Sequence, residues 1–213
     1  MNDNLLKTYT KDFEDISCTL AEIKSLKRQE MRLRRKLKTL ELKYSFLREL
    51  VGIDNEGETI SLAVKKLFIE LGFNNIQIIP EKQGIEDLRL FVDNKLFIIE
   101  TTGTEKEGHR QSKTNQISIH IPFRRKEFKD LEVIGLFITN HDNKKDFQKR
   151  NKKPFPPKYK EVAKHNNYTI TTTVDLFNAF ILFKQGKITP SEIIDKLSET
   201  GEFKILESTS KSE

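Results

Sequence analysis

The sequence predicts an α/β domain built around a mixed β-sheet and preceded by a long coiled-coil helix. Three observations carry this prediction: a heptad repeat in residues 16–51, short apolar runs between residues 76 and 171, and helical segments that alternate with those runs. A chain of 213 residues accommodates one ordinary domain and an extension, but not two full domains. We therefore expect a coiled-coil helix at residues 1–52, a domain at residues 53–200 and a polar tail at residues 201–213.

The heptad repeat begins at Ile16, which we take as position a. All a and d positions are apolar except Thr19 and Glu30, and none is Gly or Pro. Such a repeat over about five heptads predicts helices wound around each other, and we expect a homodimer. The alternative is an amphipathic helix that lies on the following domain. The a series is Ile16, Ile23, Glu30, Leu37, Tyr44 and Val51, and the d series is Thr19, Leu26, Leu33, Leu40 and Leu47.

The elements of the domain follow from turn residues and apolar runs. A hinge is expected at residues 52–57, a helix at 59–71 that ends at Gly72, and a strand at 76–79. Two extended runs at 85–92 and 95–102 meet at Asp93-Asn94, a pair that tolerates the positive φ of a hairpin turn. Later come a helix at 109–129 that Pro122 must kink or restart, a strand at 133–139, a basic loop at 140–157, a helix at 158–165, a strand at 168–171, and helices at 174–184 and 190–197.

The hairpin brings two acids together. If Asp93 and Asn94 form the turn, Asp87 faces Glu100 across the two strands, and opposed Cβ atoms lie about 4.5–5.5 Å apart. Two carboxylates at that separation repel each other unless a cation lies between them. A hard divalent ion such as Mg²⁺ removes the conflict. The alternative is a pair of solvated acids on an exposed sheet face, although the neighbours on that face include Leu96, which favours burial.

Two segments of the hairpin resemble the bipartite motif of the PD-(D/E)XK, or restriction-endonuclease-like, nucleases. These segments are Glu86-Asp87-Leu88-Arg89-Leu90 and Phe97-Ile98-Ile99-Glu100-Thr101-Thr102-Gly103. Gln116-Ile117 and residues 135–140, 154–156 and 171–177 are similar to later segments of bacterial members, so the resemblance covers about residues 57–200. It implies a restriction-endonuclease-like mixed sheet flanked by helices, and metal-dependent hydrolysis of DNA phosphodiester bonds.

The resemblance also implies roles for individual residues. Asp87 and Glu100 would be ligands of Mg²⁺ or Mn²⁺, with the backbone carbonyl of Thr101 as a third ligand. Such an ion lowers the pKa of a bound water and stabilises charge on the scissile phosphate. Gln116 would help to orient the site.

The chain departs from the family pattern at three positions. Glu86 replaces the proline, Ser61 stands where many members carry a helix glutamate, and Thr102 occupies the lysine position of the catalytic set. Because a hydroxyl cannot supply a cation, we expect Lys95, Lys106 or another basic residue to substitute, or hydrolysis to be slow or lost. Two alternatives therefore stand beside an endodeoxyribonuclease. One is a degraded nuclease-fold protein that binds nucleic acid or a partner without cutting, and the other is an assembly subunit.

Basic residues on both sides of the acidic pair favour DNA as a partner. The net charge is +6, and phosphate neutralisation by Lys and Arg gives sequence-independent affinity that depends on salt. The alternative is a solvated loop, and for the basic cluster at residues 24–38 we favour a solvated helix face. The expected DNA contacts are Lys106, Arg110, Lys113, Lys144, Lys145, Lys149, Arg150, Lys152 and Lys153.

Composition excludes several classes of protein. The single Cys18 excludes an intramolecular disulfide framework and a cysteine-based zinc site. No apolar run reaches about 18 residues and no signal peptide is evident, so we expect a cytoplasmic protein without a membrane segment. The resemblance further implies a role in restriction or anti-phage defence, with a partner protein of such a system.

Overall fold

The computed structural model describes residues 3–55, 57–80, 86–105 and 111–205, which divide into two units, Met1–Ser45 and Phe46–Glu213. The first unit contains the long helix α1 (Asp3–Lys43). The helices described in the second unit are α2 (Ser45–Leu50), which begins at the boundary, α3 (Gly57–Glu70), α4 (Gln111–Glu127), η1 (Phe147–Lys149), α5 (Pro157–His165), α6 (Thr173–Lys184) and α7 (Pro190–Ser198). Its strands are β1 (Ile76–Ile78), β2 (Leu88–Val92), β3 (Lys95–Gly103), β4 (Glu132–Asn140), β5 (Tyr168–Thr172) and β6 (Gly201–Glu202).

The long N-terminal helix is confirmed, but it ends before the last expected heptad. α1 has 41 residues and therefore extends about 60 Å. Its apolar stripe is open to solvent in the single chain, with the side chains 41–65% exposed at Ile16, Ile23, Leu26, Leu33, Leu37 and Leu40. No described helix has both the length and the apolar character needed to cross a bilayer. Pairing of α1 with another helix stays a prediction.

The globular unit begins several residues before the boundary expected at residue 52. Phe46 and Leu50 of α2 are buried, as is Val51 directly after it. Phe46 packs its ring edge-on against Phe180 of α6, with 5.7 Å between the ring centroids. The heptad pattern thus continues through residue 51, but its last apolar residues belong to the core of the domain.

Hydrogen bonds hold the start of the expected hinge, residues 52–57, against the end of β4. The carbonyl of Gly52 accepts hydrogen bonds from Nδ2 of Asn140 at 3.1 Å and from Nη2 of Arg150 at 3.1 Å. Arg150 also donates to the carbonyl of Val51 at 2.9 Å. Turn-forming residues predicted a break in the helix correctly, but three side-chain hydrogen bonds hold that break in place.

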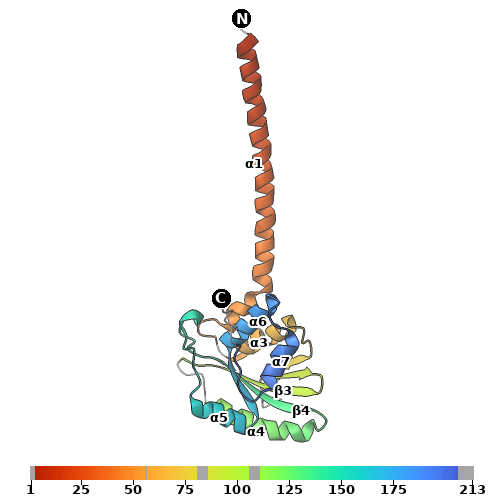
Figure 1. Cartoon of the computed structure of the whole chain (residues 1–213), viewed down its shortest axis with the longest axis vertical. Helices are drawn as coiled ribbons and strands as arrows, with labels where there is room; N and C mark the ends of the chain where they lie inside the picture. The colour runs from red at the N-terminus through yellow and green to blue at the C-terminus, as the bar shows by residue number, and fades with distance from the viewer. Residues whose placement is uncertain (1–2, 56, 81–85, 106–110, 206–213) are drawn as a thin grey trace, which may run out of the picture. The chain divides into compact units, whose positions relative to one another are not determined.

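The second unit is a six-stranded sheet, among the described residues, with helices on both faces (Figure 1). The strand order is β1-β2-β3-β4-β5-β6; β1, β2 and β3 pair antiparallel, and β3 to β6 pair parallel. Helices α4 and α5 cover one face, and α3 and α6 cover the other. The α/β class and the mixed sheet are confirmed.

The face beneath α4 and α5 forms a continuous apolar core. Alternate residues Leu96 and Ile98 of β3 meet Ile117 and Ile121 of α4, as period-two and helical spacing require. The core also contains Val133, Phe137, Phe155, Ala163, Tyr168 and Ile170, with Phe91, Phe128 and Leu131 packed at its edge. Because Glu100 follows Leu96 and Ile98 on the same face, the strand carries its carboxylate to the margin of this core.

One expectation about local structure was wrong, and another is corrected in part. α4 runs through Pro122 without a restart, although proline removes the hydrogen bond to the carbonyl four residues earlier, and a kink at Pro122 stays a prediction. The supposed tail from residue 201 begins with β6, which pairs with β5, and Phe203 is buried. A two-residue strand carries too little periodicity to be recognised from sequence.

Candidate functional site

The β2–β3 hairpin has the register that its turn residues predict. Asp93 adopts a φ of 52°, and the pairing runs from Val92 opposite Lys95 to Leu88 opposite Ile99. The amide of Asp87 then donates to the carbonyl of Ile99 at 3.0 Å, which continues the ladder by one more residue. This register places Asp87 beside Glu100.

Asp87 is fixed by the backbone and side chain of Thr101. Its Oδ2 accepts a hydrogen bond from the Thr101 amide at 2.7 Å and from the Thr101 hydroxyl at 3.0 Å. The same hydroxyl lies 2.8 Å from Oγ of Ser61 in α3. A series of hydrogen bonds from Ser61 through Thr101 to Asp87 holds Oδ2 of Asp87 in place. Oδ1 of Asp87 is directed to other partners.

A lysine from α4 lies between the two carboxylates. Nζ of Lys113 is 2.9 Å from Oε2 of Glu100 and 3.8 Å from Oδ1 of Asp87. The Glu100 side chain is fully buried, whereas the side chains of Lys113 and Asp87 are 28% and 30% exposed. The two acids therefore converge on one positive charge at a point that solvent can reach.

The other oxygen of Glu100 is buried beside a histidine. Oε1 lies 3.2 Å from Nδ1 of His120, yet neither atom has a hydrogen-bond partner among the described residues. A buried carboxylate oxygen in this state is costly unless an additional donor or cation reaches it. Glu100 thus keeps one buried oxygen without a hydrogen bond from the described residues.

Helix α4 presents three basic side chains to the acids of the hairpin. Lys113, His120 and Arg124 are spaced by seven and four residues, so they lie along one face of the helix. Lys113 and His120 contact Glu100, and Arg124 donates to Oε2 of Glu86 from Nε at 3.1 Å and from Nη2 at 3.0 Å. This row aligns α4 with the acidic end of the hairpin.

Glu86 is part of the framework of the site. Its buried carboxylate pairs with Arg124 and Arg89, and Arg124 pairs in turn with Glu127. Burial acts to raise the pKa of Glu86, but the hydrogen bonds and charges of the two arginines outweigh it and lower the pKa below its ordinary value near 4.5. Glu86 thus fixes the hairpin to α4.

Replacing Glu86 by glutamine is expected to lower the free energy of unfolding at pH 7 by roughly 3 kcal/mol, because two guanidinium groups lose a buried partner. A lowered folded-state pKa means that this stabilisation is complete above about pH 4.5 and is lost as pH falls through the folded-state value. Urea unfolding at several pH values measures both effects. Glu127→Gln is the matched control, since its side chain is 43% exposed, and we expect less than about 1 kcal/mol. A pH-independent difference between wild type and Glu86→Gln would contradict this account.

The other residues expected in the site occupy different positions. Thr102 is buried, and its hydroxyl donates to the carbonyl of Gly103 at 3.3 Å. Lys95 lies at the far end of β3, where it contacts Ser198 and Asp195, so it does not substitute for the missing lysine. Lys106 lies outside the described residues. Gln116 is exposed on α4, and none of the described contacts joins it to either carboxylate.

Asp87 and Glu100 would be the side-chain ligands of a divalent cation, since the described residues include no group of three or more His, Cys, Asp or Glu side chains that could hold one. Two carboxylates already share a positive charge, and Oε1 of Glu100 is buried without a hydrogen bond from the described residues. Asp87 and Glu100 supply the hard oxygen ligands that Mg²⁺ prefers, and ligands from water and phosphate usually complete its coordination. Lys113 would have to move aside or share this place with a metal.

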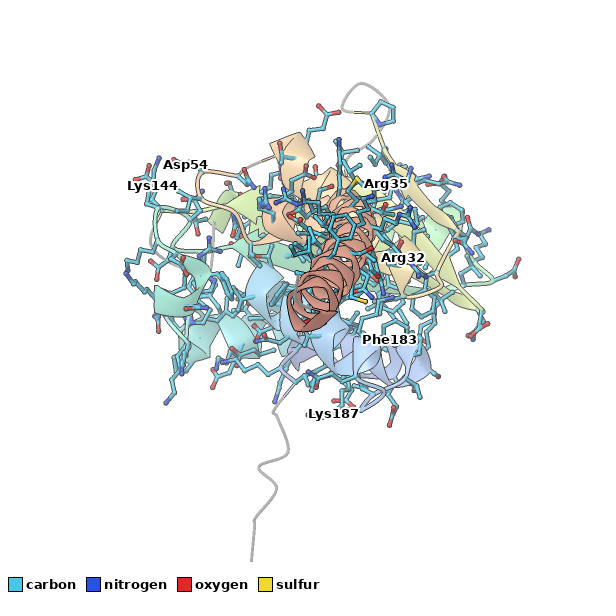
Figure 2. All side chains as sticks on the ribbon, turned by 90° about the horizontal axis from the view of Figure 1, so that it is seen from above. Arg32, Arg35, Asp54, Lys144, Phe183 and Lys187 are labelled. Carbon is cyan, nitrogen blue, oxygen red and sulfur yellow. The ribbon has the colours of Figure 1, made fainter. Side chains whose placement is uncertain are left out.

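The basic loop after β4 separates into a buried and an exposed part. Arg150 is 5% exposed and donates to Asn140 and to backbone carbonyls, so its role is structural and it is removed from the expected DNA contacts. Lys144 pairs with Asp54 at 2.5 Å, and the two side chains lie next to each other in Figure 2. The exposed lysines of the loop are Lys144, Lys145, Lys149, Lys152 and Lys153. Arg110, like Lys106, lies outside the described residues.

The fold is restriction-endonuclease-like, as comparison with solved structures shows. The restriction endonuclease FokI bound to DNA is similar to this chain with a TM-score of 0.55 and 12% sequence identity over 76% of the chain. FokI without DNA gives a TM-score of 0.54 at 12% identity over 75% of the chain. The small subunit R.BspD6I2 of the heterodimeric restriction endonuclease R.BspD6I gives 0.51 at 14% identity over 74% of the chain.

The matched lengths differ between these proteins. The chain spans 30% of FokI in both structures and 86% of the R.BspD6I small subunit. No family model matches the sequence, and no curated protein is significantly similar to it.

Proposed function

We propose that this chain is a divalent-metal-dependent nuclease that hydrolyses DNA phosphodiester bonds. The observation that carries the proposal is the convergence of Asp87 and Glu100 on one cationic group, next to a buried carboxylate oxygen without a hydrogen bond from the described residues. The arrangement occurs in a restriction-endonuclease-like fold, at the hairpin whose sequence resembles the PD-(D/E)XK motif.

The metal would be held by Asp87, Glu100 and the backbone carbonyl of Thr101. Bound there, Mg²⁺ or Mn²⁺ lowers the pKa of a water and offsets charge that develops on the phosphate. The hydrogen bonds from Thr101 keep Asp87 oriented, and the side chain of Glu100 is fully buried. Gln116 would assist from the exposed side of α4 once DNA is bound.

Lys113 is the residue we propose in place of the missing lysine. Thr102 has only a hydroxyl at that position, whereas the ammonium group of Lys113 already contacts both acids. Its side chain is flexible and partly exposed, so it can follow the scissile phosphate and neutralise negative charge in the transition state. The positive charge would thus be supplied by helix α4 and not by strand β3.

DNA would approach over the lysines around this edge of the domain. Exposed Lys149, Lys152 and Lys153 can contribute phosphate contacts, with Lys144 and Lys145 beside them. FokI, a structural neighbour, has been solved with DNA, and another neighbour is a subunit of a heterodimer. These likenesses support DNA as the substrate. A homodimer through α1 and a role in restriction or anti-phage defence, together with a partner protein, are part of the proposal.

A second candidate function is DNA binding without cleavage. The observation that favours it is the ion pair itself, since the ammonium group of Lys113 supplies positive charge to both acids without a metal. A domain of this kind would position another effector on DNA.

Incubation of the purified protein with supercoiled plasmid separates the two functions. We expect nicked or linear DNA with Mg²⁺ or Mn²⁺ and none with EDTA. Asp87→Asn protein, purified in parallel, controls for contaminating nuclease. A folded protein that binds DNA in Ca²⁺ but cleaves nothing in either metal would favour the second candidate. A protein that neither binds nor cleaves would overturn both.

A further inference from the structure

The apolar stripe of α1 needs a partner. In the single chain its side chains are 41–65% exposed from Ile16 to Leu40. The 28 residues from Ile16 to Lys43 make four heptads, which is enough for a stable coiled coil. We propose that the stripe is covered by a second copy of this chain, aligned in parallel and in register, and this deepens the homodimer of the proposed function.

Charge complementarity selects the parallel orientation. In a parallel pair, each g residue faces the e residue of the next heptad on the other helix. Glu22 then meets Lys27 of the second copy, and Lys36 meets Glu41 of the second copy. Two-fold symmetry doubles both pairs, so four opposite-charge contacts flank the seam.

The remaining contact between g and e positions does not bring like charges together. Gln29 at g faces Arg34 at e of the other copy, and a glutamine amide can accept a hydrogen bond from the guanidinium. Within the heptads of α1, the parallel register therefore creates no like-charge contact between g and e positions.

An antiparallel pair sets like charges together. There, e residues face e residues and g residues face g residues. In the alignment that sets Glu30 against Leu26 of the other copy, Lys27 meets Lys27. In the alignment that sets Glu30 against Leu33 of the other copy, Lys27 meets Arg34. A further shift of one heptad brings Arg34 against Arg34. Each antiparallel alignment that pairs at least three of the four heptads thus includes a repulsive pair, whereas the alignment with Glu30 facing Thr19 has none but pairs only residues 16–33 within the stripe.

Glu30 supports a unique register. It stands at an a position, where a polar side chain fixes alignment at a cost in stability. The structure partly neutralises it, since Arg34 lies 2.8 Å from its carboxylate and donates a hydrogen bond of 2.9 Å. In the in-register parallel pair the two Glu30 carboxylates fall in one layer, where they repel each other and each is offset by Arg34 of its own helix. A shift of one heptad would bury one Glu30 against Leu37 and the other against Ile23.

The face of α1 opposite the seam stays available to solvent. It carries Lys24, Arg28, Arg32, Arg35 and Lys38, of which Arg32 and Arg35 are labelled in Figure 2. A seam at positions a and d leaves these side chains outside the contact. A parallel pair also joins both globular units to the same end of the coiled coil. This arrangement suits cleavage of both strands of a DNA duplex.

Disulfide trapping tests the orientation directly. In a Cys18→Ser background, Leu33→Cys places a thiol at position d, which faces its own equivalent only in the in-register parallel pair. We expect rapid formation of a covalent dimer on mild oxidation. Arg35→Cys, on the outer face, is the matched control and should stay largely monomeric on denaturing gels.

Charge reversal gives a second readout that does not depend on a thiol. Lys27→Glu makes Glu22 repel residue 27 of the other copy, and we expect the dimer dissociation constant to rise about tenfold. Adding Glu22→Lys should restore it. Sedimentation equilibrium measures both constants.

The alternatives predict other results. A monomer at all concentrations overturns the proposal. A dimer that Lys27→Glu tightens, and that Leu33→Cys fails to cross-link, is antiparallel and also overturns it. These measurements read association alone, so loss of nuclease activity leaves their outcome unchanged.

Discussion

Replacement of Glu100 by glutamine is expected to lower plasmid cleavage by at least about 10³-fold. The substitution keeps the volume and removes the charge of a fully buried side chain that contacts Lys113 and His120. The proposed metal would lose an anionic ligand, and with it the means to activate water and offset phosphate charge. Initial rates of cleavage in Mg²⁺ and Mn²⁺ measure the effect, with thermal unfolding to verify that the variant is folded.

Glu105→Gln is the matched control for Glu100→Gln. Glu105 lies five residues beyond Glu100, its side chain is 67% exposed, and its described ion-pair partner is Lys144 at 3.8 Å. We expect its cleavage rate to stay within about twofold of wild type, since exposed charges contribute little. Undiminished cleavage by folded Glu100→Gln would remove the basis of the proposed site.

Replacement of Lys113 by methionine is expected to lower kcat for cleavage by about 10²-fold, with a smaller change in KM. Methionine preserves much of the stem but not the ammonium group that contacts Glu100 and Asp87. A residue that stabilises charge only in the transition state affects kcat, whereas a DNA contact affects KM. Single-turnover cleavage and DNA affinity in Ca²⁺ separate the two effects.

Addition of Thr102→Lys to the Lys113→Met variant should restore much of the lost activity, because it returns a cation to the strand beside Glu100. Lys126→Met is the matched control, since Lys126 is exposed near the other end of α4. Faster cleavage by Lys113→Met would show that the ammonium group competes with the metal. Weaker DNA binding without rescue would make Lys113 a phosphate contact, the role that the basic segments of the sequence predict for it.

The sequence predicts the acidic pair because hairpin register is a local property. Asp93 and Asn94 specify the turn, and alternation along β3 specifies the face on which Glu100 lies. Both signals are contained in about 16 residues. For this reason local spacing is enough to predict the register and the position of Asp87, and both are confirmed.

The position of Lys113 could not be predicted in the same way. It depends on how α4 is rotated and docked on the sheet, and this follows from the packing of Ile117 and Ile121 rather than from local spacing. A weak signal was available, since Lys113, His120 and Arg124 share one helical face. Sequence alone offers no reason to place that face against acids.

Burial also separates Arg150 from the other cations of its loop. In the sequence it is one of several basic residues in a polar segment, which is why it was expected to contact DNA. In the structure it is the residue whose geometry satisfies the carbonyls of Val51 and Gly52, together with Asn140. Composition identifies a cationic loop, but only coordinates distinguish the arginine that folds it from the lysines that stay in solvent.

The early start of the globular unit determines how the protein can be shortened. A fragment that begins at residue 53 would lack Phe46, Leu50 and Val51, and would expose the ring of Phe180 that Phe46 covers. The guanidinium of Arg150 would also lose the two carbonyls it holds. A globular domain released from its helical extension should therefore retain α2 in full, with the cut placed in the last turn of α1.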